Sequence, residues 1–270
     1  MIKSWTKKWV LILFLMASCF SYLVATTGEK YFKMANQALK RGDYHRAVAF
    51  YKRSCNLRVG VGCTSLGSMY EDGDGVQKDL PKALYYYRRG CHLKGGVSCG
   101  SLGFMYFNGT GVKQNYAKAL SLSKYACSLD YGISCNFVGY MYRNAKGVQK
   151  DLKKALANFK RGCHLKDGAS CVSLGYMYEV GMDVKQNGEQ ALNLYKKGCS
   201  LKEGSGCHNV AVMYYTGKGA PKDLDKAISY YKKGCALGFS GSCKVLEEVV
   251  GKESDNLQDD AQNDTQDSVQ

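Results

Sequence analysis

Apolar residues recur at spacings of three and four along most of this chain, which is typical of one face of an α-helix. After residue 60 they fall at Leu66, Met69 and Tyr70, and the same arrangement returns at intervals of 36 residues. The later sets are Leu102, Met105 and Tyr106, then Val138, Met141 and Tyr142, then Leu174, Met177 and Tyr178. A period of this length predicts an array of small helical units that stack to bury their apolar faces.

A second helix is predicted within each unit. A glycine loop such as Gly73-Asp74-Gly75 ends at a short polar residue, after which apolar residues resume at Ala83, Leu84 and Tyr87. Asp or Asn at the start of a helix accepts a hydrogen bond from an orphan backbone amide, so this position is expected to be the N-cap. The expected N-caps are Asp79, Asn115, Asp151, Asn187 and Asp223. The chain is therefore predicted to be all-α, with two helices per repeat.

Cysteine spacing indicates how neighbouring helices are linked. Cys91 and Cys99 flank the turn at Gly95-Gly96, and residues equally far from the turn of an antiparallel helix pair face each other at disulfide distance. Zinc ligands usually lie two to four residues apart, so neither a metal nor another cofactor is expected. Twelve of the 13 cysteines form such pairs: Cys55 with Cys63, Cys91 with Cys99, Cys127 with Cys135, Cys163 with Cys171, Cys199 with Cys207, and Cys235 with Cys243.

The two ends of the chain differ from the repeats. Lysines followed by an apolar run and a small-residue end predict a signal peptide over residues 1–25, which would remove Cys19 and place the remaining cysteines in an oxidising compartment. An alternative is a lipoprotein signal, with Cys19 as the anchored residue. Residues 251–270 hold six acids, one lysine and few apolar residues, so they are predicted to form a disordered tail. The repeats would occupy residues 26–250.

The motif from Leu66-Gly67-Ser68-Met69-Tyr70 to Asp79-Leu80-Pro81-Lys82-Ala83 resembles the Sel-one-like repeat, a relative of the tetratricopeptide repeat. With a cysteine pair in each unit and a leader in front, residues 28–250 are similar to the Helicobacter cysteine-rich proteins. The resemblance implies a right-handed superhelix of six helix pairs and a capping helix, with one disulfide per repeat. It also implies secretion or periplasmic export and, for some members, penicillin binding with weak β-lactamase activity.

The charge changes this picture little. The chain has a net charge of +15, but much of it falls in the last turn of each second helix, where cations complement the helix dipole. Nucleic acid is not an expected partner, because export, the disulfides and the absence of a groove-reading motif all oppose it. An anionic surface remains a candidate partner, and the chain is expected to be a monomer.

Binding is expected on the first helices, which line the concave side of a tetratricopeptide superhelix. Positions there that do not hold the core vary from repeat to repeat, and they combine aromatic rings, side-chain amides and one cation. Such groups suit an extended peptide, a peptidoglycan fragment, a β-lactam or a protein partner. The predicted groove residues are Asn36, Phe104, Asn136, Tyr140, Arg143, Tyr176 and Asn209.

An enzymatic function needs a nucleophile or a metal. Ser121 and Ser229 begin S-x-x-K sequences, but the companion motifs of serine β-lactamases are missing and the lysines belong to the basic last turns. The four histidines form no local ligand pair. Two functions therefore stay open, an exported binding module and a weak β-lactamase.

Overall fold

The computed structural model describes residues 26–248, so the expected signal peptide with Cys19, and the acidic tail, lie outside the described residues. The chain divides into two compact units, Met1–Tyr131 and Gly132–Gln270, here called unit 1 and unit 2. All regular secondary structure in the described part is helical. None of the helices found there is both long enough and apolar enough to cross a membrane.

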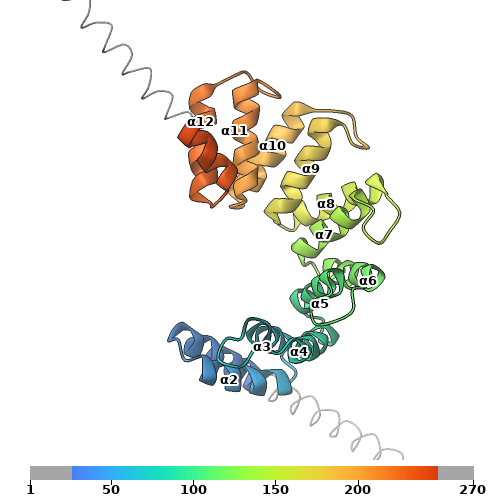
Figure 1. Cartoon of the computed structure of the whole chain (residues 1–270), viewed down its shortest axis with the longest axis vertical. Coiled ribbons are helices and arrows are strands. Elements are labelled where there is room, and N and C mark those ends of the chain that lie inside the picture. The colour runs from blue at the N-terminus through green and yellow to red at the C-terminus, as the bar shows by residue number, and fades with distance from the viewer. Residues whose placement is uncertain (1–25, 249–270) are drawn as a thin grey trace, which may run out of the picture. The chain divides into compact units, whose positions relative to one another are not determined.

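Each unit is a succession of helices joined by short turns and longer loops (Figure 1). Unit 1 begins with a helix over residues 26–40 and continues with α2 (Tyr44–Asn56), α3 (Gly60–Asp72), α4 (Leu80–His92), α5 (Gly96–Asn108) and α6 (Tyr116–Ser128). Unit 2 contains α7 (Gly132–Arg143), α8 (Leu152–His164), α9 (Gly168–Val180), α10 (Gly188–Ser200), α11 (Gly204–Thr216), α12 (Leu224–Ala236) and a helix over residues 240–248. The all-helical repeat fold predicted from the sequence is confirmed.

The helices joined by a glycine loop, such as α3 with α4 and α9 with α10, make the most extensive contacts. Glycine in the first helix permits this close packing. A Cβ atom on Gly139 would lie 2.6 Å from the ring of Phe159, and one on Gly175 would lie 2.8 Å from the ring of Tyr195. The glycine of the repeated motif thus makes room for an aromatic ring of the second helix.

Within each unit, disulfides join neighbouring helix pairs across the short turns, where helix contacts are fewer. In unit 1, Cys55 is bonded to Cys63 between α2 and α3, and Cys91 to Cys99 between α4 and α5. In unit 2 the bonds are Cys163 to Cys171 (α8 to α9), Cys199 to Cys207 (α10 to α11) and Cys235 to Cys243 (α12 to the last helix). Cys127 and Cys135 are also disulfide-bonded. The prediction of one disulfide per repeat of about 36 residues is confirmed.

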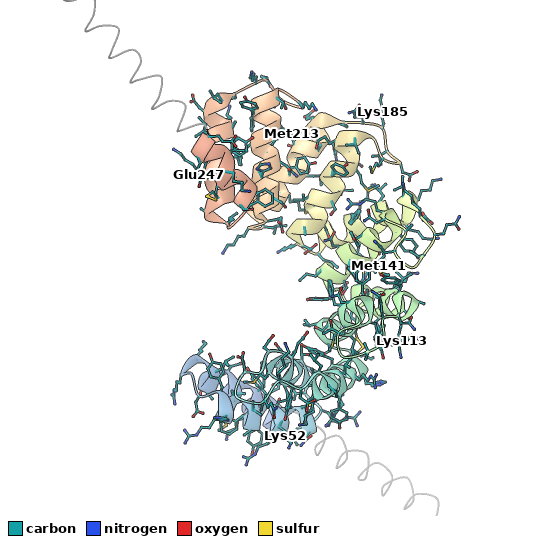
Figure 2. The ribbon with its side chains drawn as sticks, viewed as in Figure 1. Lys52, Lys113, Met141, Lys185, Met213 and Glu247 are labelled. Atoms are coloured by element: carbon teal, nitrogen blue, oxygen red, sulfur yellow. A yellow bond between two sulfur atoms is a disulfide. The ribbon has the colours of Figure 1, made fainter. Side chains whose placement is uncertain are left out.

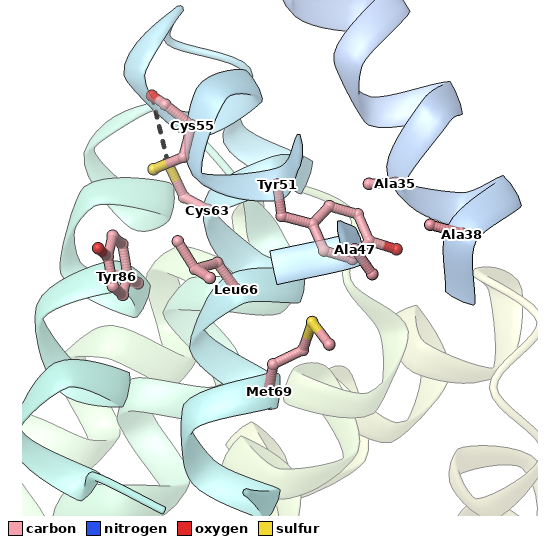
Figure 3. Packing of buried hydrophobic residues seen from close by; sticks show 9 residues of the cluster. All are labelled: Ala35, Ala38, Ala47, Tyr51, Cys55, Cys63, Leu66, Met69 and Tyr86. Carbon is pink, nitrogen blue, oxygen red and sulfur yellow. Dashed lines mark hydrogen bonds between the residues drawn. A yellow bond between two sulfur atoms is a disulfide. The ribbon is translucent and has the colours of Figure 1, made fainter. Parts of the chain in front are cut away.

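Apolar side chains fill the space between successive helices. In unit 1, Leu66 and Met69 of α3 face Tyr51 of α2 and two alanines of the first helix, Ala35 and Ala38 (Figure 3). In unit 2, Met141 of α7 and Met213 of α11 hold the same repeat position and are fully buried (Figure 2). One core column therefore runs through successive repeats.

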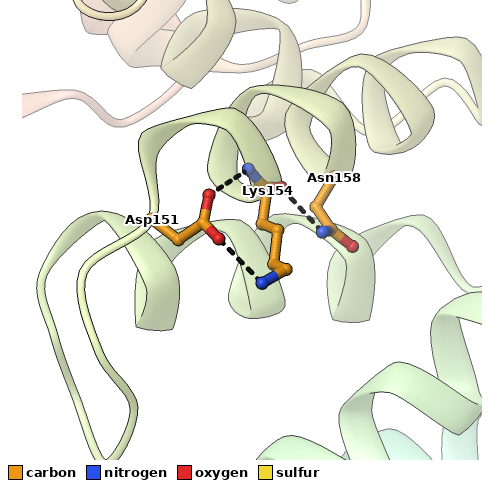
Figure 4. Close-up of polar contacts among 3 residues, drawn as sticks. All are labelled: Asp151, Lys154 and Asn158. Carbon is orange, nitrogen blue, oxygen red and sulfur yellow. Dashed lines mark hydrogen bonds and ion pairs between the residues drawn. The ribbon is translucent and has the colours of Figure 1, made fainter.

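The predicted N-caps are confirmed, and a lysine three residues later reinforces the three aspartate caps, Asp79, Asp151 and Asp223. Asp151 accepts hydrogen bonds from the backbone nitrogen of Lys154 and from its Nζ atom, both at 2.8 Å (Figure 4). The same Nζ lies 5.4 Å from the ring centre of Tyr142 on α7. The lysine of the D-x-x-K-A motif therefore ties the start of one helix to the preceding one.

Candidate functional site

A pocket of about 530 Å³ lies in unit 2, on the face formed by α7, α9 and α11. These helices are the first of their pairs, and α9 contacts both α7 and α11. Since the repeat length is constant, equivalent positions on the three helices lie next to one another. The lining residues are Arg143, Asn144, Lys150, Leu152, Val172, Ser173, Tyr176, Met182 and Asn209.

Arg143 is the last residue of α7, and aromatic rings surround its guanidinium group. The Cζ atom lies 5.5 Å from the ring centre of Phe159 on α8 and 5.9 Å from that of Tyr176 on α9. Phe159 is fully buried, whereas Tyr176 is 41% exposed. Among the described residues no acidic side chain pairs with Arg143. The guanidinium is thus in cation–π contact with two rings, and no carboxylate of the described residues binds its N–H groups.

The loop after α7 supplies the next part of the wall. In the other glycine loops of this kind a glycine directly after the helix adopts left-handed backbone, as at Gly109 and Gly181. Ala145 occupies that position here with a φ of 53°, and α7 ends one residue earlier than the other first helices. Asn144 donates a hydrogen bond to the carbonyl of Tyr140 at 2.9 Å. This altered turn places Asn144 at the pocket.

Positive charge at the pocket is not cancelled by a neighbouring acid. Arg143 and Lys150 line it, and no Asp or Glu does. Asp151 follows Lys150 directly, but its carboxylate is bound by Lys154, whose hydrogen bonds hold the pKa of Asp151 below its usual value. The carboxylate of Glu179 on α9 accepts a hydrogen bond from the hydroxyl of Tyr195 at 2.6 Å.

Three of the predicted groove residues, Arg143, Tyr176 and Asn209, line this pocket together. Asn136 lies on the adjoining part of α7, where its Oδ1 accepts a hydrogen bond from the hydroxyl of Ser173 at 3.1 Å. Tyr140 is half-buried, with its ring stacked on that of Phe137 at 6.3 Å.

Asn36 and Phe104 belong to unit 1 and do not line the pocket. The Oδ1 atom of Asn36 accepts a hydrogen bond from the hydroxyl of Tyr51 at 2.5 Å. Phe104 is 37% exposed. The structure thus divides the predicted groove residues between the two units.

Sequence reasoning missed the loop residues Asn144 and Lys150. The sequence does contain a signal for this loop, because Ala145 occupies the position after the first helix at which other repeats have glycine, as at Gly109 and Gly181. Lys113 and Lys185, in the equivalent loops before α6 and α10, are exposed and do not line the pocket (Figure 2). A lysine in such a loop therefore does not by itself predict a site.

The serines that matched a catalytic motif are not placed for catalysis. Ser121 and Lys124 are both exposed on α6, and Ser229 and Lys232 are both exposed on α12. None of these residues lines the unit 2 pocket. Within residues 26–248 no three His, Cys, Asp or Glu side chains are grouped so that they could hold a metal ion.

The histidines are scattered. Those on α2, α4 and α8 are exposed. His208 on α11 is half-buried, with its Nδ1 atom 3.1 Å from the hydroxyl of Ser242 and its ring against Tyr231 and Phe239. Burial lowers the pKa of His208. His208 therefore acts as a packing residue between α11, α12 and the last helix.

Comparison with known proteins places these repeats in a family. The family model described as the Sel1 repeat matches residues 30–58, 61–94, 97–131, 132–167, 168–202 and 204–239. A Sel1 repeat protein from Oxalobacter formigenes has a similar fold, with a TM-score of 0.72 and 24% identity, over 81% of this chain and 87% of that one.

Two Helicobacter pylori proteins of strain J99 are similar over shorter segments. HcpD, whose name gives beta-lactamase as an unconfirmed activity, is 88% identical over 82 residues, which span 30% of this chain and 27% of HcpD. "Beta-lactamase HcpA" is 38% identical over 72 residues, which span 26% of this chain and 29% of HcpA. The matches thus span less than a third of the length of these relatives.

Proposed function

The chain belongs to the Sel1 repeat family, and from that premise we propose that it is an exported binding module that holds a peptide or peptide-like ligand noncovalently in the unit 2 pocket. The observation that supports this most is the meeting of Arg143, Tyr176 and Asn209 in one pocket. They come from three different helices, and each supplies a different kind of contact. The disulfides and the close relationship to HcpD favour export.

The pocket suits a short ligand better than a large folded partner. Its volume of about 530 Å³ is in the usual range for small-molecule sites, roughly 300 to 1,000 Å³. Val172, Met182 and Tyr176 offer apolar and aromatic surface, while Asn144 and Asn209 offer amides that can bond to a peptide backbone. This mixture is typical of sites in which a few polar groups orient an otherwise apolar ligand.

Binding by the unreduced protein tests the proposal. A pool of random hexapeptides is passed over immobilised protein, and retained peptides are identified by mass spectrometry. Tyr176→Ala and Asn209→Ala together should reduce retention, whereas Tyr125→Ala, an exposed tyrosine on α6, should not. Equal retention by the pocket variant and the wild-type protein would place binding elsewhere and contradict the proposal.

The names of the relatives favour a second candidate, weak β-lactam hydrolysis. Ser121 and Ser229 are exposed, and within residues 26–248 no metal cluster supports it. Nitrocefin turnover is the test, on protein from a strain that lacks other β-lactamases, with Ser121→Ala and Ser229→Ala as variants. Loss of turnover in either variant would establish hydrolysis and replace the noncovalent proposal.

A further inference from the structure

We propose that the unit 2 pocket is a carboxylate-binding site, in which Arg143 is the principal anchor and Lys150 a second cation. This inference rests on the proposed binding function and specifies the ligand class: a short peptide-like molecule with a free carboxylate. A peptide C-terminus and a β-lactam acid both have this chemistry.

The environment of Arg143 suits it to this role. Its guanidinium lies over the rings of Phe159 and Tyr176, at 5.5 and 5.9 Å from their centres. These contacts are with the rings, and no carboxylate of the described residues binds the N–H groups of the guanidinium, which match the two oxygens of a carboxylate. Because Phe159 is fully buried, the ring on one side of the guanidinium is fixed in place. The Arg143 side chain therefore loses less conformational freedom when a ligand binds.

The surrounding charges favour an anion. Arg143 and Lys150 line the pocket without a lining acid. Asp183 follows the lining residue Met182, but it is exposed and does not line the pocket. Asp151 is bound by Lys154 at 2.8 Å, and Glu179 by the hydroxyl of Tyr195 at 2.6 Å. Two cations are thus left uncompensated, and an anionic ligand would supply the missing negative charge.

The shape of the pocket restricts which anion fits. An inorganic anion would occupy only a small part of about 530 Å³. The remaining wall includes Val172, Met182 and Tyr176, which contact apolar groups, and the amides of Asn144 and Asn209. A carboxylate at one end of a short chain of amides would meet all three kinds of surface at once.

The carboxylate is tested by comparing N-acetyl-alanyl-alanine with its C-terminal amide. Both are titrated into the unreduced, ¹⁵N-labelled full chain, and dissociation constants are taken from chemical shift changes. We expect the acid to bind roughly tenfold to a hundredfold more tightly, as a charge-assisted hydrogen bond would give. Benzylpenicillin, titrated in parallel, assigns the source of the carboxylate: the acid that binds more tightly, peptide or β-lactam, is the closer mimic of the ligand.

Three variants separate the role of Arg143 from general effects. Arg143→Gln should reduce the preference for the acid to the smaller part that Lys150 gives, and Arg143→Lys should keep more of it because the charge remains. Lys146→Gln removes an exposed charge from the same loop without altering the lining, so it should leave the preference unchanged. Intact disulfides and an unchanged amide spectrum outside the pocket show that each variant is folded.

The outcomes distinguish the two proposals. Equal binding of acid and amide, or a preference that Arg143→Gln does not reduce, overturns the carboxylate site but leaves a peptide-binding pocket in place. If neither molecule shifts the pocket resonances while retained hexapeptides do, the carboxylate site is overturned alone. If hexapeptides also fail to bind, both the carboxylate site and the proposed peptide-binding function are overturned.

Discussion

Removing the disulfide between Cys163 and Cys171 should loosen α8 and α9 by a calculable amount. The two cysteines are eight positions apart, so the bond closes a loop of about nine residues. For such a loop the chain-entropy model gives about 2.6 kcal/mol at 25 °C. Alanine is the suitable replacement, because both positions are buried and a serine hydroxyl there would lack a partner. The double variant Cys163→Ala with Cys171→Ala should therefore lower the free energy of unfolding by about this amount.

Hydrogen exchange of backbone amides provides the local assay. In a repeat protein each repeat contacts mainly its neighbours, so the loss of stability should concentrate in α8 and α9. There the opening equilibrium should rise roughly 80-fold, which follows from 2.6 kcal/mol. The matched double variant Cys55→Ala with Cys63→Ala removes a bond of the same sequence separation in unit 1, and it should show an equal effect confined to α2 and α3. Unchanged exchange in α8 and α9, or effects that differ between the two variants by more than about 1 kcal/mol, would refute the loop-entropy reasoning.

Three further predictions concern single residues. Ala145→Gly should stabilise the protein by about 1 kcal/mol in urea unfolding, because alanine is strained at a φ of 53° where other repeats place glycine; an unchanged midpoint would contradict this. The lowered pKa of His208 means that the unfolded chain takes up its proton first. The contribution of neutral His208 to stability is therefore complete above its ordinary pKa of 6.5, and it is lost as pH falls through the lower pKa of the folded state. His208→Gln should abolish that loss of stability in unfolding curves measured between pH 7.5 and pH 5. Tyr195→Phe should destabilise unit 2 by about 1 to 3 kcal/mol in thermal unfolding, since Glu179 loses its hydrogen bond donor; a neutral effect would show that water replaces the hydroxyl.

The elements that the sequence predicted best depend on residues that are close together along the chain. Asp79 caps α4 by accepting a hydrogen bond from the amide three residues later, and the cysteines of a pair are separated by a single short turn. The pairs Cys199 with Cys207 and Cys235 with Cys243 follow the same rule. Such contacts are settled by spacing along the chain. Repetition makes these contacts easier to recognise, because the same spacing returns in each repeat.

The pocket depends on contacts that spacing does not determine. Arg143 of α7 contacts a ring from α8 and a ring from α9, so its position reflects three helices at once. Asn136, which was predicted to bind a ligand, holds the same repeat position as Thr64 and His208. Side chains at this position also connect neighbouring repeats. Thr64 bonds to Ser98 at 2.5 Å, and His208 lies 3.1 Å from Ser242. A variable position can therefore serve inter-repeat packing as well as a ligand, and only the three-dimensional arrangement separates the two uses.

The basic residues of the chain also differ in whether the fold uses their charge. Lys82, Lys154 and Lys226 each bind an N-cap aspartate and lie over a tyrosine of the preceding helix, so their charge is used within the fold. Arg143 and Lys150 are not used in this way. A ligand attracted by overall charge would bind the repeats alike, whereas one recognised by these two cations must bind unit 2. Selectivity for one repeat, rather than total affinity, is therefore the property that distinguishes a binding site from a basic surface.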